Sequence, residues 1–171
     1  MIEVNITKED IAFAREKLSK VKSTNTGLSK FGSENKRILT GYVGERIVMK
    51  YLDIANDSDT YNYDIIFKDK KLEIKTISCK FKPRPDYWCT VNSHDLAGVH
   101  KQEADFYVFL RVLNDYSKGW LLGYMPCKDF FDKGTFVPKG KDFGKFKFVK
   151  ANATILPIHD LRAIETLKNQ A

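Results

Sequence analysis

Residues 104–112, ADFYVFLRV, constrain the fold of this 171-residue chain more than any other stretch. Apolar side chains fill nearly every position from Phe106 to Val112, which predicts a strand that is buried on both faces. Such a strand needs a layer of structure on either side of its sheet, so the pattern favours an α/β architecture. Apolar residues make up 43% of the chain and aromatic residues 13%, which is enough to fill one core of this kind.

Helices and further strands are expected around this strand. Thr7 and the acids that follow it begin a short amphipathic helix, and a stronger helix runs from about Asn35 to Leu52. Residues 22–36, between the two helices, are polar and are typical of a linker. Strands are expected at 63–67, 72–77, 87–91 and 120–125, short helices at 94–102, after Pro126 and from about Asp160, and a basic hairpin or loop within 134–152.

These elements predict one domain in three parts. Residues 1–34 form an N-terminal helix and linker, residues 35–125 a core with a mixed central β-sheet flanked by helices, and residues 126–171 a basic C-terminal extension.

The charge of the chain bears on its partners. Its 29 Lys and Arg exceed its 22 Asp and Glu, so the net charge is +7. This excess favours a polyanion, and nucleic acid before a membrane surface, because no basic amphipathic helix dominates. The three cysteines are widely spaced and form no metal-binding pair, which indicates a reducing compartment. Without an apolar signal segment, a soluble cytoplasmic protein with no membrane partner is expected.

The expected hairpin at 63–77 carries charged residues inside its strands. Side chains alternate between the faces of a strand, so Glu73 and Lys75 share one face, while Leu72, Ile74 and Thr76 share the other. Carboxylate oxygens from Asp64 and Glu73, with the backbone carbonyl of Ile74, suit a hard cation such as Mg²⁺, or Mn²⁺ in its place. Lys75 can then contact a water molecule and the phosphate that it attacks. The alternative is an exposed Glu73–Lys75 pair on a solvated sheet face, which contributes at most about 1 kcal/mol.

The order of these features resembles the PD-(D/E)XK nuclease superfamily, over about residues 36–125. A glycine-containing helix bears Glu45, Asp64 begins the hairpin, Glu73-Ile74-Lys75 follows after eight residues, and the apolar strand comes later. The resemblance implies a restriction-endonuclease-like fold in which Asp64 and Glu73 bind the metal, Lys75 orients or activates water, and Glu45 lies near the metal. Tyr63 stands where the motif name has Pro.

Two groups of basic residues are candidate DNA contacts. Lysines interleaved with aromatic rings suit phosphate binding combined with base stacking, although lysines also keep the edge strands of a sheet solvated. The first group surrounds the hairpin, and aromatic residues including Trp88 follow it. The predicted nucleic-acid-binding residues are Lys68, Lys70, Lys71, Lys80, Lys82, Arg84 and Trp88, and, further along the chain, Lys141, Lys145 and Lys147.

The sequence therefore predicts a magnesium-dependent DNA endonuclease, with a homodimer expected because enzymes that cut both strands often act as pairs. A Holliday-junction or branched-DNA resolvase is an alternative subtype. A nucleic-acid-binding protein with the same fold but no turnover, and a basic adaptor in which the Asp, Glu and Lys spacing is accidental, also stay open.

Overall fold

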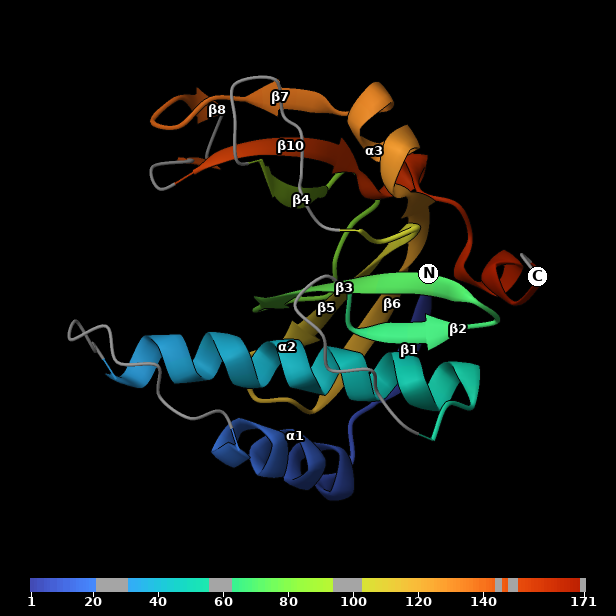
Figure 1. Cartoon of the computed structure of the whole chain (residues 1–171). Helices are drawn as coiled ribbons and strands as arrows, with labels where there is room; N and C mark the ends of the chain where they lie inside the picture. The colour runs from blue at the N-terminus through green and yellow to red at the C-terminus, as the bar shows by residue number, and fades with distance from the viewer. Residues whose placement is uncertain (21–30, 56–62, 94–102, 144–145, 148–150, 170–171) are drawn as a thin grey trace.

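The computed structural model describes residues 1–20, 31–55, 63–93, 103–143, 146–147 and 151–169, with the backbone alone at 31–34, 93, 142–143 and 146–147. Figure 1 shows three layers: two helices, a five-stranded sheet, and a smaller sheet with a short helix beside it. The chain is thus a mixed α/β protein, as the apolar strand predicted. No helix among the described residues is long and apolar enough to span a membrane.

The five-stranded sheet has the strand order β1-β6-β5-β3-β2. Its strands are β1 (Ile2–Asn5), β2 (Ile65–Phe67), β3 (Lys70–Cys79), β5 (Phe106–Leu113) and β6 (Lys118–Pro126). β3 and β5 run parallel, whereas the other neighbouring pairs are antiparallel. Lys68 and Asp69 join β2 to β3 with φ of 47° and 62°, the positive values that a two-residue type I′ hairpin turn requires.

Side-chain alternation along β5 gives the sheet two apolar faces. Phe106, Val108, Leu110 and Val112 face the helices and pack into one core cluster. Tyr107 and Phe109 point the other way, into a second cluster with residues of the smaller sheet. The strand is buried on both faces, as its sequence predicted.

The helices α1 (Lys8–Lys20) and α2 (Phe31–Leu52) form the layer on one face of the sheet (Figure 1). The N-terminus of α1 is capped as predicted, because Thr7 N–H donates to Asp10 Oδ2 at 2.9 Å and Asp10 N–H donates to Thr7 Oγ1 at 3.3 Å. α2 packs directly on β3 at Gly44, where a Cβ atom would lie 1.8 Å from Thr76 Oγ1. Glycine at this position therefore allows the close approach of helix and strand.

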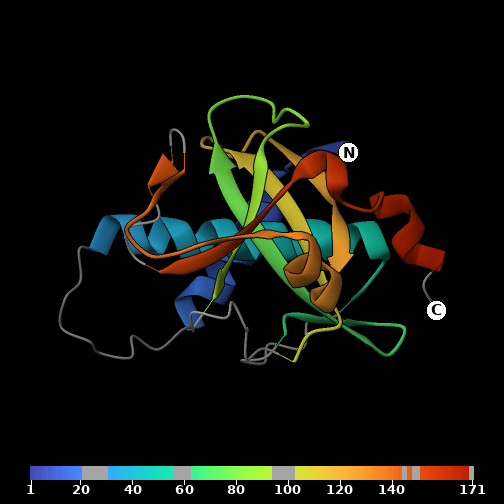
Figure 2. The same ribbon diagram turned by 90° about the horizontal axis from the view of Figure 1, so that it is seen from above.

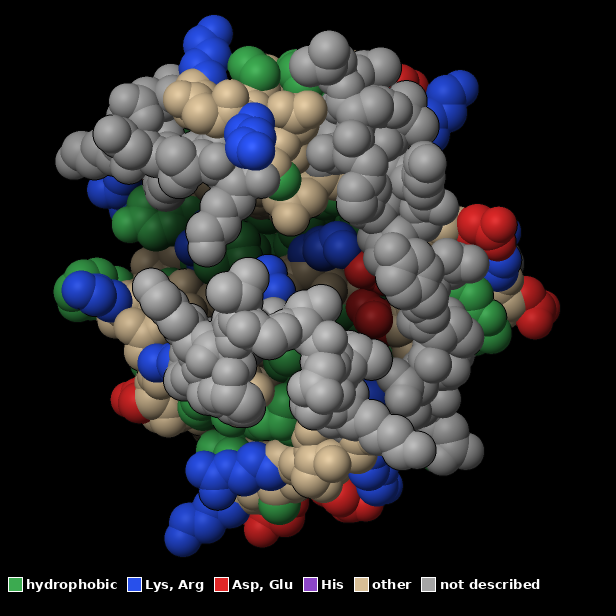
Figure 3. All heavy atoms as spheres, turned by 60° about the vertical axis from the view of Figure 1, so that its left-hand side comes forward, with side chains coloured by type: hydrophobic (Ala, Val, Ile, Leu, Met, Phe, Trp, Pro, Cys, Tyr) green, Lys and Arg blue, Asp and Glu red, His purple; other side chains and the backbone are tan. Residues whose placement is uncertain are grey.

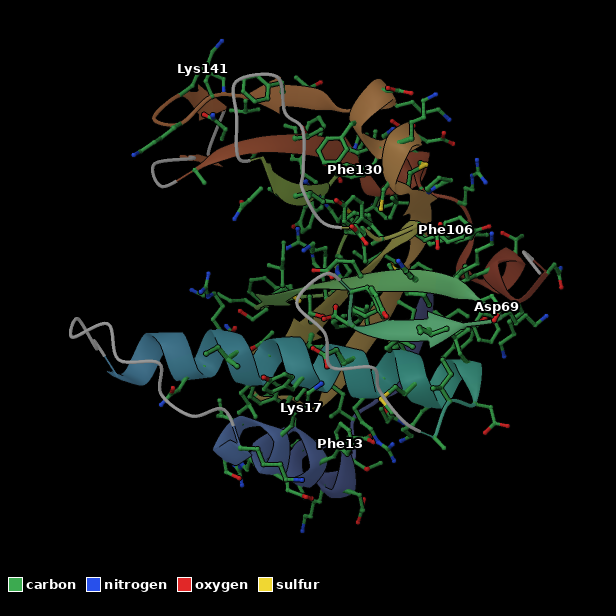
Figure 4. All side chains as sticks on the ribbon, in the orientation of Figure 1. Phe13, Lys17, Asp69, Phe106, Phe130 and Lys141 are labelled. Carbon is green, nitrogen blue, oxygen red and sulfur yellow. The ribbon has the colours of Figure 1, made fainter. Side chains whose placement is uncertain are left out.

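The smaller sheet lies on the opposite face and has the order β4-β10-β7. Its strands are β4 (Trp88–Ser93), β7 (Thr135–Val137) and β10 (Asn152–Pro157), and α3 (Cys127–Lys133) lies beside it. Phe130 of α3 points into the second core cluster, where its ring stacks on that of Phe109 at 5.2 Å between centroids (Figure 4). Figure 2 shows the smaller sheet crossing the five-stranded one.

The structure corrects several expectations about the first half of the chain. Residues 2–5 form β1, which pairs with β6, and the alternation of Ile2 and Val4 was the signal for it. Residues 31–36, expected in the linker, belong to α2, because adding residues to a helix that has already formed costs far less than starting one. The third predicted strand exists as β4 but joins the smaller sheet. The helix expected at 94–102 lies outside the described residues.

The second half of the chain also differs from expectation. Residues 126–171, expected as an extension, supply α3 and two of the three strands of the smaller sheet. In place of one short helix from about Asp160, two 3-10 helices, η1 (Ile158–Asp160) and η2 (Ile164–Asn169), follow β10, in keeping with the short lengths at which this helix type occurs. The basic hairpin was predicted correctly, as β8 (Asp142–Phe143) and β9 (Phe146–Lys147).

Candidate active site

The candidate site begins where the short strand β2 ends. β2 covers β3 from Lys70 to Leu72, and beyond that point no other strand in the described part of the chain pairs with this edge of β3. Asp64 closes the first part of the gap: its N–H donates to the Leu72 carbonyl at 2.9 Å, and its Oδ2 accepts from the Ile74 N–H at 2.7 Å. The Asp64 carboxylate therefore lies against the backbone between Glu73 and Lys75.

Glu73 and Lys75 lie on the face of β3 that looks toward the smaller sheet. Their neighbours on β5 are Tyr107 and Phe109, which belong to the second core cluster. Lys75 Nζ lies 2.6 Å from Glu73 Oε1 and 5.7 Å from the centre of the Tyr107 ring. Because Glu73 is only 6% exposed, the alternative of a solvated surface pair is wrong.

Glu45 approaches the same region from α2. It is buried, and its charge is close enough to Asp64 to raise the pKa of that carboxyl group. Lys17 of α1 donates to Glu45 Oε2 at 2.7 Å, and both side chains are nearly buried. Figure 4 shows Lys17 between the two helices. Lys17 was not predicted from the sequence, although its place three residues after the buried Ala14 puts it on the inward stripe of α1.

The surroundings of Asp64 raise its affinity for a proton. Burial, and then the charges of Glu73 and Glu45, raise the pKa of Asp64 to about 7. The hydrogen bond from Ile74 N–H and the charge of Lys75 act in the opposite direction. Asp64 therefore sits in a place where negative charge is in excess of what the nearby lysines neutralise, and where an added cation is favoured.

The donors at this edge fit a hard divalent cation. Within the described residues no three His, Cys, Asp or Glu side chains are arranged to hold a metal ion. Magnesium, however, is commonly held by one or two carboxylates, with waters and substrate phosphates in its other positions. The N–H and C=O of one strand residue point to the same side, so the Ile74 carbonyl faces the open edge together with its N–H. Asp64, Glu73 and that carbonyl make such an oxygen set, whereas Glu45 is engaged by Lys17.

The floor of the site on the β5 side is kept neutral by Tyr107 and Cys127. Their side chains are hydrogen-bonded to each other. Burial, helped by the charge of Glu73, raises the pKa of Cys127 to about 12 and holds the pKa of Tyr107 above its usual range. Neither group ionises near neutral pH, which excludes Cys127 as a thiolate nucleophile.

The face of the molecule in Figure 3 is hollowed across its middle, and both basic and acidic side chains lie at the bottom of the hollow. This juxtaposition of charges in a recess differs from an exposed ion pair, since water is partly excluded and each charge acts more strongly on its neighbours.

The basic residues around the hairpin fall into two groups at opposite ends of β3, which is about 30 Å long. Lys68, Lys70 and Lys71 lie at the β2–β3 turn. Lys68 Nζ donates to the carbonyl of Lys168 at 2.8 Å, and Lys71 Nζ lies 3.5 Å from Glu103 Oε2. This group is therefore partly engaged in contacts with the protein itself.

Lys80, Lys82 and Arg84 follow the other end of β3. Lys80 and Lys82 are exposed on either side of Phe81, whose ring is itself 76% exposed. Arg84 pairs with Asp86 at 2.9 Å and lies 5.0 Å from the centre of the Tyr87 ring, and the half-buried Trp88 begins β4. These residues form a basic and aromatic surface as the sequence predicted.

The second predicted group, Lys141, Lys145 and Lys147, is described only in part. Lys141 is exposed between β7 and β8, in the upper part of the molecule in Figure 4, while the β2–β3 turn, marked by Asp69, lies at the far side. Lys147 is in β9, of which the structure describes the backbone only, and Lys145 lies outside the described residues.

No family model matches this chain, and no curated protein matches it. Membership of the family that the motif resembles is therefore a proposal, which stands on the residues of the site.

Proposed function

We propose that this protein is a metal-dependent nuclease, most simply a DNA endonuclease, with a restriction-endonuclease-like core. The observation that carries the proposal is the way Asp64 closes the open edge of β3 beside the Glu73–Lys75 pair. The proposal combines two carboxylates, one strand carbonyl and one ammonium group from residues up to eleven positions apart in the chain. These are the groups that hydrolysis of a phosphodiester needs.

The arrangement of the elements supports this core. A long helix, α2, precedes an antiparallel hairpin, and the strand with Glu73 and Lys75 runs parallel to the apolar strand β5. This is the element order that underlies the resemblance. The departure is β4, which leaves the central sheet after the hairpin and pairs with β10.

The residues of the site have separate roles in the proposed reaction. Asp64, Glu73 and the Ile74 carbonyl would hold Mg²⁺ or Mn²⁺, which supplies a more acidic water and offsets the charge of the phosphate. Lys75 lies 2.6 Å from Glu73 and would contact the attacking water and a phosphate oxygen. Lys17 fixes Glu45 beside them, so that Glu45 adds negative charge without being a free ligand.

The decisive experiment is a cleavage assay on three substrates. Purified protein is incubated with supercoiled plasmid, linear duplex and single strands, each with Mg²⁺ or with a chelator. We expect chelator-sensitive nicking of the circular plasmid, which an exonuclease cannot produce. DNA binding without any cleavage would instead indicate a binding protein without turnover, and preferential cutting of four-way junctions would indicate a resolvase. Light scattering on the same sample tests the expected homodimer.

A further inference from the structure

Arg111 lies on the same face of the sheet as Glu73 and Lys75. Residues alternate along β5, and Tyr107, Phe109 and Arg111 are aligned with Glu73, Lys75 and Ile77 of the parallel strand β3. Arg111 is thus one step beyond Phe109, two residues along and one strand across from Lys75. At ordinary strand spacing their backbones are about 8 Å apart. Nothing in the sequence singles out Arg111, because it lies inside an apolar run.

Within the residues that the structure describes, the guanidinium of Arg111 is held without a negative partner. One terminal nitrogen donates to the Trp88 carbonyl at 2.9 Å, and the group lies 5.6 Å from the centre of the Tyr87 ring. Its Nε is buried and makes no hydrogen bond within the described part of the chain. The other titratable groups near it are the thiols of Cys79 and Cys89, whose pKa values remain raised by burial despite the nearby cation.

Other partly buried cations in the described structure each have a carboxylate partner. Lys17 is paired with Glu45, Lys75 with Glu73, and Arg46 with Asp10. Arg111 has no such carboxylate among the described residues. Shielding a cation from water without a counter-charge costs free energy, and a bound anion offsets that cost. The position of Arg111 therefore suits a ligand that carries an anion. The fork of a guanidinium is well matched to a phosphate.

We propose that Arg111 binds a backbone phosphate of the substrate, next along the strand from the phosphate at Lys75. The identity of the anion rests on the proposed nuclease function. The order of residues along β3 gives the direction of the strand: from Glu73 and Lys75 past Arg111 toward Lys80, Phe81 and Lys82. There the exposed ring of Phe81 between two lysines offers a stacking surface for a base. The substrate class is therefore a strand that is unpaired on this side of the cleavage point.

The test measures binding, so that it does not depend on cleavage. In the Glu73→Gln background, with chelator, a fluorescent single-stranded DNA oligonucleotide is titrated over a salt series with and without Arg111→Met. We expect the slope of log affinity against log salt to fall by about 0.7 for one lost phosphate contact. Arg162→Met is the matched control. It removes an arginine that is paired with Asp129 at 2.8 Å, and it should leave the slope unchanged.

A second arm locates the phosphate. A neutral methylphosphonate replaces one phosphate of the oligonucleotide at a time. At one linkage, this replacement should weaken binding several-fold to the protein that retains Arg111, and should not change binding to the Arg111→Met variant. If Arg111→Met does not fold, Arg111→Lys replaces it: this variant should keep the slope and lose affinity at that same linkage. An unchanged slope and an unchanged methylphosphonate profile would overturn the proposal and leave Arg111 as a tie between β5 and β4. Another outcome is that Arg111→Met loses the effect of methylphosphonate at that linkage while the unsubstituted protein cleaves no plasmid. That outcome would support the phosphate contact of Arg111 and overturn the proposed hydrolysis.

Discussion

The two faces of β3 place one strand in opposite surroundings. Toward α2, Leu72, Ile74 and Thr76 lie in an apolar interface that is close enough to require glycine at position 44. Toward the smaller sheet, Glu73 and Lys75 form a largely buried ion pair. The comparison shows a division of tasks: the packed face fixes the backbone of the strand, and the fixed backbone holds the charged side chains of the other face in position.

The largest expected effect is on the charged face. Lys75→Ala should lower the rate of DNA cleavage by about 10²- to 10⁴-fold, because the group that orients the attacking water is lost. Metal binding should be retained, whereas the melting temperature should fall, because Glu73 is left buried without its cation. Asp64→Asn and Glu73→Gln should also abolish cleavage but keep DNA binding, since the repulsion between carboxylates is relieved. Normal cleavage by all three purified variants would place the site elsewhere; Glu165→Gln, at an exposed position in η2, is the control.

The packed face should respond in stability instead. Gly44→Ala puts a methyl group 1.8 Å from Thr76 Oγ1, so the free energy of unfolding should fall by about 1–3 kcal/mol. Gly41→Ala is the matched control in the same helix: no atom lies within 4 Å of the position that its new methyl group would take, and the better helix former should stabilise by up to about 1 kcal/mol. Denaturant unfolding measures both. Thr76→Ala should rescue Gly44→Ala, and equal stabilities for the two glycine variants would contradict the close approach.

Asp64 lies at the edge of the sheet where the two faces meet, and its protonation makes the stability of the protein depend on pH. In metal-free protein its pKa is about 7, above the ordinary value of 3.8, so the folded state binds the proton more tightly than the unfolded state. Stability therefore decreases as pH rises from about 4 to 7, and the loss is complete above 7. Asp64→Asn removes this dependence. At pH 8 in chelator it should be more stable than the unsubstituted protein by on the order of a few kcal/mol, with the gap closing toward pH 4.

Thermal melts across that range provide the measurement. Asp129→Asn in α3 should keep the unsubstituted pH dependence. Parallel profiles for the Asp64 variant and the unsubstituted protein would show that the pKa of Asp64 is not raised in the folded state.

The two predicted groups of basic residues allow a further comparison of DNA binding. Replacing Lys80, Lys82 and Arg84 with Ala should reduce the salt slope of DNA binding by up to about three units, raise the KM for DNA and weaken binding to all sequences alike. The triple variant of Lys141, Lys145 and Lys147 should have a smaller effect, since Lys141 lies far from the site. Filter binding at several salt concentrations distinguishes them. An unchanged slope for the first variant would return these lysines to a solubilising role.

The smallest effect is expected at the hydroxyl beneath Gly44. Thr76 Oγ1 is buried and has no hydrogen-bond partner within the described residues, so Thr76→Val should be neutral or stabilising by up to about 1 kcal/mol. Thr40→Val in α2 is the contrast, because Thr40 Oγ1 donates to the Lys36 carbonyl at 2.8 Å and meets Tyr116 Oη at 2.9 Å. That variant should lose about 1 kcal/mol. A marked loss for Thr76→Val would reveal an interaction of its hydroxyl.

What could be read from the sequence was local. The apolar run of β5, the cap at Thr7 and the alternation around Glu73 depend on neighbours in the chain, and all three were predicted. The pairings of β1 with β6 and of β4 with β10 join distant segments, and no short-range pattern encodes them. The same holds at the site, where the sequence pointed to Asp64, Glu73 and Lys75 but not to Lys17 or Arg111, whose roles come from contacts made across the fold.

The pairing of β4 with β10 also has a consequence for the order of events during synthesis. Trp88 is paired with Pro157 and Ser93 with Asn152, so β4 leaves the ribosome long before its partner does. The hairpin with Glu73 and Lys75 and the strands β5 and β6 are made in that interval, and domains fold from the N-terminal side as they emerge. A nascent chain can thus complete its five-stranded sheet, charged residues included, while the strand that secures the sheet above them has not yet been translated.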